Sequence, residues 1–214
     1  MPSEGFEPTS LYSQVRLAGF PVYISSQFAL GKVGLRRKTL EELGRQLTRI
    51  AAVVPSKAFQ SLLQVPFWVE LDTGPAGAVF HYSEDWLNRH DMNPDKARSV
   101  EIQNARHFLE WTRRDQPWLI LHELSHGYHW MHVKAFDGVI RKAFEHARSA
   151  GLYDSVDYVG GFRRKAYALT NEREYFAELT ESYFGRNDYY PFNREQLRAF
   201  DPDGFHALQQ IWGE

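Results

Sequence analysis

The hydrophobic pattern of the chain changes at Pro117. Before Pro117, short runs rich in β-branched and aromatic residues predict strands. These runs occupy residues 21–28, 65–71, 78–82 and, as a weaker case, 99–103. One helix is expected among them, over residues 38–54, where apolar residues recur every three or four positions. After Pro117 the same helical spacing continues through most of the chain, and no linker interrupts it. Strands followed by helices in one chain predict a single α+β domain over residues 1–214.

Three helices are expected after Pro117. The first begins at Pro117 itself, because proline suits the first turn of a helix. The second has its apolar face over residues 136–147 and ends at Gly151. The third begins near Asn171 and ends before Gly185, which is expected to cap it in the left-handed conformation. The basic residues 163–165 between them are interpreted as a solvated turn.

The first of these helices carries the sequence His-Glu-Leu-Ser-His at 122–126. On a helix, His122 and His126 lie one turn apart on the same face, so both imidazoles can reach one metal ion. Glu123 is adjacent to the first histidine, where its carboxylate can take a proton from a water molecule on the metal. The motif therefore supplies two metal ligands and a general base, and the third ligand must come from elsewhere.

A cysteine cannot be the third ligand, because the chain contains none. The same absence excludes disulfide scaffolds and cysteine nucleophiles. His129 lies about 10.5 Å along the helix axis from His122, too far to share one ion. His132 has the spacing of the metzincins, but that arrangement needs a helix break, normally at a glycine, and His129 occupies that position. Both histidines are therefore rejected as ligands.

The third expected helix offers a better candidate. Glu174, Glu178 and Glu181 are spaced by four and three residues, so they share one helical face. Glu174 can complete the metal site. Glu178, which lies one helical turn further along the chain, can accept the free N–H of a ligand histidine. Two other interpretations need no metal. The three carboxylates can form a solvated acidic face, or Asn171 and Glu174 can form a capping box.

Two short segments, HELSH at 122–126 and YALTNEREYFAE at 167–178, resemble the glutamate-type zincins. Among these zincins they resemble in particular the family of the anthrax lethal factor catalytic domain. It implies a zincin-like fold, in which a small twisted sheet with an edge strand lies over the active-site helix and a mostly helical half follows. The core of this domain would span about residues 60–200.

The resemblance also implies roles for individual residues. It places Glu174 as the third ligand of a single Zn²⁺ ion, beside His122 and His126. It places Glu178 where a carboxylate supports a ligand histidine. It places Tyr167 where a tyrosine polarises the carbonyl of the bond to be cleaved.

The chain is therefore expected to be a zinc-dependent metallopeptidase that acts on a peptide or protein substrate. An extended substrate is expected to pair with an edge strand near residues 76–83. The alternative is a catalytically silent zinc-binding or protein-interaction module on the same fold. We assign no specific role to the segment 185–192. Its residues Asp188 and Tyr190 can support the site or anchor a turn.

Charge and N-terminal sequence limit the partners of the chain. It has 25 Lys and Arg and 27 Asp and Glu, a formal charge of −2. That balance argues against nucleic acid or an anionic membrane as the main partner. The first ten residues lack the basic start and apolar core of a signal peptide, and no apolar run approaches the roughly 18 residues of a membrane span. We expect a soluble protein, either cytoplasmic or secreted with its signal removed.

Overall fold

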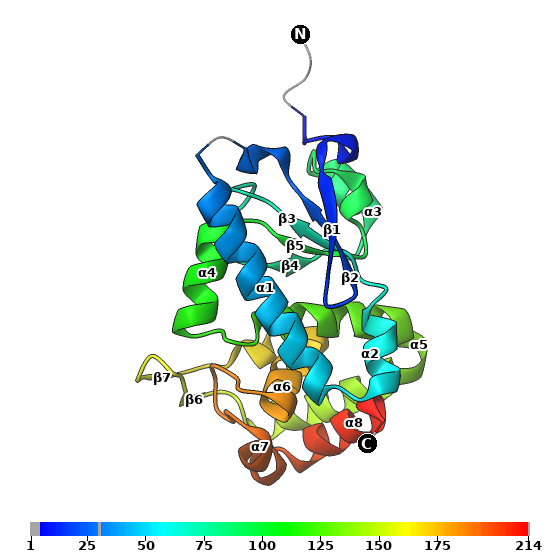
Figure 1. Cartoon of the computed structure of the whole chain (residues 1–214). Helices are drawn as coiled ribbons and strands as arrows, with labels where there is room; N and C mark the ends of the chain where they lie inside the picture. The colour runs from blue at the N-terminus through cyan, green and yellow to red at the C-terminus, as the bar shows by residue number, and fades with distance from the viewer. Residues whose placement is uncertain (1–4, 30, 214) are drawn as a thin grey trace.

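A five-stranded mixed sheet forms the upper part of the molecule (Figure 1). The computed structural model describes residues 5–29 and 31–213. The three inner strands are parallel to one another, and the two edge strands, β1 and β4, are antiparallel to their neighbours. In spatial order the strands are β1 (Ser13–Leu17), β2 (Phe20–Ile24), β3 (Phe67–Val69), β5 (Val100–Ile102) and β4 (Val79–Phe80).

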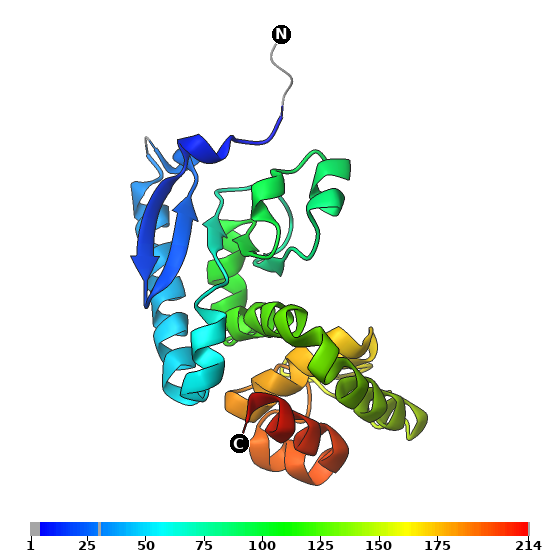
Figure 2. The same cartoon turned by 90° about the vertical axis from the view of Figure 1, so that its right-hand side faces the viewer.

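Helices surround this sheet and make up most of the second half of the chain. In Figure 2 the long helix α5 runs between the part that bears the sheet and helices α6–α8. A two-stranded hairpin, β6 (Val156–Asp157) and β7 (Arg163–Arg164), precedes α6. The helices are α1 (Val33–Val53), α2 (Ser56–Leu62), α3 (Glu84–Arg89), α4 (Ala105–Arg114), α5 (Leu119–Ser149), α6 (Glu172–Phe184), α7 (Arg194–Phe200) and α8 (Pro202–Trp212), with short 3-10 turns at Thr9–Leu11, Ser26–Phe28, Pro94–Lys96 and Tyr167–Leu169. The predicted combination of a small sheet with a mostly helical second half is confirmed.

Apolar side chains hold the sheet against α1 and α4. Val22, Phe67 and Val100 lie in register across the three parallel strands, and all three are fully buried. Leu47 of α1 and Phe108 of α4 belong to the same buried cluster. Because alternate residues of a strand point to opposite faces, this row makes one face of the three parallel strands apolar.

The opposite face of the sheet carries a buried charged network that the sequence did not predict. Lys96 Nζ lies 2.7 Å from Glu70 and also contacts Glu101. His81, which follows β4 directly, places its Nε2 2.7 Å from Glu101. Burial alone would raise the pKa of Glu101, but His81 and Lys96 lower it to about 2. The network thereby attaches the end of the edge strand β4 to the centre of the sheet.

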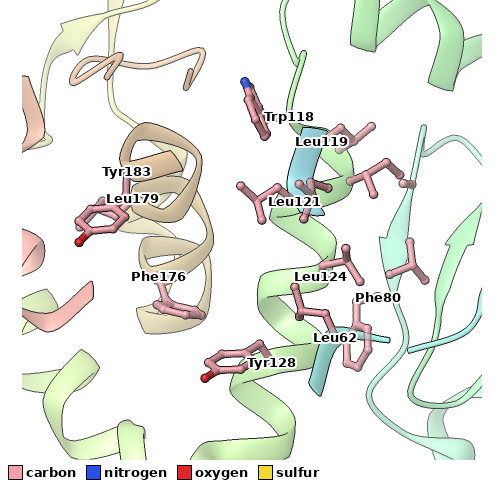
Figure 3. Packing of buried hydrophobic residues seen from close by; sticks show 14 of the residues in the cluster. Leu62, Phe80, Trp118, Leu119, Leu121, Leu124, Tyr128, Phe176, Leu179 and Tyr183 are labelled. Carbon is pink, nitrogen blue, oxygen red and sulfur yellow. The ribbon is translucent and has the colours of Figure 1, made fainter. Parts of the chain in front are cut away.

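Helix α5 packs against the sheet on one side and against α6 on the other (Figure 3). Gly127 of α5 lies close to the ring of Phe80 of β4, whereas Tyr128 of α5 and Phe176 of α6 both stack on Trp212 of α8. The two helices predicted over residues 117–151 are one element with a kink, since only His132 has non-helical backbone angles (φ −118°, ψ 15°). None of the helices in the described part of the chain combines the length and apolarity needed to cross a membrane.

The prediction of a left-handed cap at Gly185 is wrong. Gly185 follows α6 with φ −151°, far from the left-handed region. A Cβ atom at Gly185 would lie 2.1 Å from the indole ring of Trp118, the residue that precedes α5. A side chain is excluded here by the close approach of α6 to the start of α5, and not by the backbone angles of the turn.

Candidate metal centre

Helices α5 and α6 bring together the three predicted ligand side chains. One oxygen of Glu174, Oε2, lies 3.1 Å from His122 Nε2 and 3.2 Å from His126 Nε2. Three ligand atoms from these residues all lie within 4.8 Å of one another. Metal bonds of 2.0–2.2 Å in tetrahedral geometry separate neighbouring ligand atoms by about 3.3 Å. The three side chains therefore have the spacing required around a single ion.

The contacts of His122 require either a metal ion or a second ring proton between these atoms. The other ring nitrogen, Nδ1, lies 2.8 Å from Glu181 Oε1 and can donate its hydrogen there. A neutral imidazole with its hydrogen on Nδ1 points the lone pair of Nε2 at the Glu174 carboxylate. Two electron-rich atoms 3.1 Å apart repel each other unless a proton or a metal ion lies between them.

The pKa values of the same residues show how strongly the site favours positive charge. Burial alone would lower the pKa of His122, but its contacts with Glu174 and Glu181 raise that pKa well above the ordinary histidine value. Burial would likewise raise the pKa of Glu174, yet His122 and His126 hold it far below its usual range. A bound cation satisfies all three groups without requiring extra protons in a buried site.

The start of α6 places Glu174 at this position. The side chain of Asn171 accepts hydrogen bonds from the backbone N–H groups of Arg173 and Glu174, which fixes the first turn. A capping box would also direct the Glu174 carboxylate back to Asn171. That carboxylate instead contacts the two histidines, so Asn171 starts the helix while Glu174 remains available to a metal ion.

Glu181, and not Glu178, is the carboxylate within hydrogen-bond distance of the Nδ1 atom of His122. The sequence predicts that Glu178 accepts the free N–H of a ligand histidine. Its Oε1 lies 3.6 Å from His122 Nδ1, however, compared with 2.8 Å for Glu181. Glu178 accepts a hydrogen bond from the Asn187 side chain instead. The two glutamates share one helical face, and only the crossing of α5 and α6 decides which one reaches the ring.

This difference predicts unequal effects of two matched substitutions. Glu181→Ala is expected to lower the affinity for Zn²⁺, used as the probe ion, by about 10–100-fold, because His122 loses the acceptor that orients its ring. Glu178→Ala is expected to have a smaller effect. Competition titration against a chromogenic chelator measures both affinities. A larger loss in Glu178→Ala would return the orienting role to Glu178.

Glu123 connects the motif to the edge strand. Its Oε2 accepts a hydrogen bond from the backbone N–H of Phe80, at 2.7 Å. The N–H of the next residue, His81, bonds to Ser99 beside β5, so Phe80 points its own N–H away from the sheet. Burial raises the pKa of Glu123, and the nearby histidines offset part of that rise. The carboxylate is thus held at a fixed position and is more basic than an exposed glutamate.

A cleft of about 600 Å³ opens onto these residues. His122, His126, Glu123 and Glu174 line it, together with side chains from β4, α4 and the β6–β7 hairpin. Tyr167 lines the same cleft and is 47% exposed, with its ring centroid 6.3 Å from that of His122. A molecule in the cleft can therefore contact Glu123, Tyr167 and the group formed by the two histidines and Glu174 at once.

The remaining residues singled out in the sequence take other positions. His129 is 2% exposed, with its Nε2 3.8 Å from Asp137, and His132 lies at the kink of α5. Neither belongs to a group of described residues that can hold a metal ion. Asp188 lines the cleft, and burial together with Glu181 raises its pKa to about 7. Tyr190 packs against Phe200 and anchors the turn.

Comparison of the chain with protein families, with curated proteins and with solved structures finds no match. The chemistry of the cleft is therefore the basis for assigning a function.

Proposed function

We propose that the chain is a zinc-dependent metallopeptidase in which His122, His126 and Glu174 hold one Zn²⁺ ion. The observation that carries the proposal is the position of one Glu174 oxygen, 3.1 and 3.2 Å from two imidazole nitrogens in a cleft shared with Glu123. Two imidazoles and a carboxylate suit zinc, and three protein ligands leave a fourth position for water or substrate, as catalytic sites require.

The same features support a zincin-like fold and a relation to the gluzincins. The two histidines and Glu123 come from one helix, and the third ligand comes from a second helix 48 residues along the chain from His126. An antiparallel edge strand, β4, contacts the first helix through the Phe80–Glu123 hydrogen bond. These are the elements that the resemblance to the lethal factor family leads us to expect.

The bound zinc ion, Glu123, the Phe80 N–H and Tyr167 have separate roles in the proposed peptide hydrolysis. When bound, zinc supplies a Lewis acid that lowers the pKa of a water molecule from about 15.7 toward 7. Glu123 accepts a proton from the attacking water and passes it to the leaving amine. The N–H of Phe80 keeps that carboxylate in place. The Tyr167 hydroxyl donates a hydrogen bond to the substrate oxygen on which negative charge develops.

Replacement of Tyr167 by Phe tests the last of these roles. Tyr167→Phe is expected to lower kcat by about 10²–10³-fold, as the loss of one oxyanion donor does, with zinc content unchanged. Tyr82→Phe is the matched control, since Tyr82 also lines the cleft and is assigned no role in binding or catalysis. Hydrolysis rates and elemental analysis of both variants provide the measurement. An unaltered rate in Tyr167→Phe would leave that tyrosine a packing residue.

The peptidase proposal is tested by incubating the zinc-loaded chain with a mixture of random decapeptides. Mass spectrometry is expected to detect new termini, and removal of the metal with a chelator is expected to stop their appearance. Zinc binding without any cleavage would favour the alternative, a silent zinc-binding module on the same fold.

A further inference from the structure

The cleft continues past the metal ligands to the β6–β7 hairpin, where Arg164 forms part of its wall. The guanidinium carbon of Arg164 lies 5.3 Å from the ring centroid of Tyr158 and 5.4 Å from that of Tyr189. Phe162 adds a third ring at 5.9 Å. Tyr158 is itself fixed, because its hydroxyl donates to Asp115 at 2.8 Å. Cation–π contacts with these rings hold the charged group beside the cleft.

Arg164 has no acidic partner, unlike the arginines near it. Arg163 faces Asp157 at 3.8 Å, and Arg114 pairs with Asp115 at 3.1 Å. Within residues 5–29 and 31–213, no ion pair or side-chain hydrogen bond reaches the guanidinium of Arg164. Aromatic rings stabilise its charge but accept few of its five N–H donors. Those donors remain available to a molecule in the cleft.

The acidic residues of the cleft do not occupy this position. Glu178 and Glu181 are only 3–4% exposed and lie around the side of His122 that faces away from Glu174, and Asp188, which is 5% exposed, forms no ion pair with Arg164. Asp115 already accepts hydrogen bonds from Tyr158 and Arg114. Among the described residues that line this end of the cleft, Arg164 is therefore the cation without an acidic partner. A carboxylate is the ligand that matches a guanidinium best, because two parallel N–H groups can bind its two oxygens.

We propose that Arg164 forms a subsite for a carboxylate of the bound peptide, either an acidic side chain or the C-terminal carboxylate. This inference rests on the proposed function, since it assumes that the cleft binds peptides. Neighbouring residues of a strand point to opposite faces, so the side chains of Arg163 and Arg164 have different surroundings. Residues 163–164 form strand β7 and not the predicted turn, although both arginines are exposed as expected, and Arg164 also lines the cleft.

Binding measurements can test the subsite without turnover. The probes are fluorescein-labelled random decapeptide mixtures with an amidated C-terminus and one fixed Glu, Gln or Lys, placed in turn at each position. A further pair of mixtures, free acid and amide, isolates the C-terminal carboxylate. Fluorescence anisotropy on zinc-loaded Glu123→Gln protein is expected to show one carboxylate-bearing probe that binds about 3- to 10-fold more tightly than its neutral counterpart.

Two substitutions in the hairpin assign this preference to one residue. Arg164→Gln is expected to remove the preference, and Arg164→Glu to shift it toward Lys. Arg163→Gln, the matched control, is expected to keep it. Equal binding of the acidic and neutral probes, or a preference that survives in Arg164→Gln, would overturn the proposal.

Failure of the subsite and failure of the peptidase proposal give different results. Cleavage of the same mixtures by the native chain is scored separately from binding. Cleavage without a carboxylate preference overturns the subsite alone. A carboxylate preference without cleavage supports the subsite and removes the peptidase.

Discussion

Glu123→Gln is expected to lower peptide hydrolysis by about 10²–10⁴-fold while the protein keeps its zinc, because general-base catalysis contributes rate enhancements of this size. Glutamine has nearly the same shape as glutamate, and its side-chain oxygen can still accept the hydrogen bond from the Phe80 N–H. The contact between β4 and α5 therefore remains. What is lost is the group that accepts a proton from water.

The matched control for this variant is Glu172→Gln. Glu172 lies in the first turn of α6, outside the residues that line the cleft. Measurements of kcat/KM and of zinc per chain on both variants separate the base from a general effect of lost charge. Hydrolysis by Glu123→Gln within a few-fold of the native rate would show that another group takes the proton.

Glu174→Ala is expected to lower the affinity for zinc by at least about 100-fold, which exceeds the loss from supporting carboxylates. Two imidazoles alone then face the ion, which loses its one carboxylate ligand. Ligand linkage adds a second measurement, since an ion that binds only the folded state raises Tm as its concentration rises. The native chain is expected to show this rise, and Glu174→Ala is expected to lose it over the same zinc concentrations.

Glu172→Ala provides the comparison for this effect, because Glu172 lies in the same turn of α6 and contacts neither histidine. It is expected to retain the native zinc content and the zinc-dependent rise in Tm. If Glu174→Ala still carried one zinc per chain after dialysis, the third ligand would have to be another residue.

The fold could be predicted for segments in which buried apolar side chains follow one another or recur at a regular spacing. The strands β2 and β3 carry runs of apolar residues because the sheet buries them, whereas the weaker prediction for β5 reflects Glu101 between its two apolar residues. The edge strand β1 went unpredicted because most of its side chains are exposed, and only two of its residues, Val15 and Leu17, are apolar. The charged network around Glu101 was equally hidden, since its partners come from separate segments that only the fold brings together.

The site could be predicted where its geometry is local. His122, Glu123 and His126 lie within five residues on one helix, so their spacing alone places both imidazoles on one face. The choice between Glu178 and Glu181 depends on how α6 crosses α5, and helical spacing contains no information about that crossing. Arg164 is similar, because its partners Tyr158 and Tyr189 come from the hairpin and from the segment after α6.

The central claim is that three side chains hold one zinc ion at a catalytic site. Its most direct test is a titration of metal-free protein with Zn²⁺ while the cleavage rate of the random decapeptide mixture is followed. We expect no cleavage without metal, and a cleavage rate that rises with added zinc and reaches its plateau at one zinc per chain. Cleavage by the metal-free protein, or no cleavage at any zinc concentration, would contradict it.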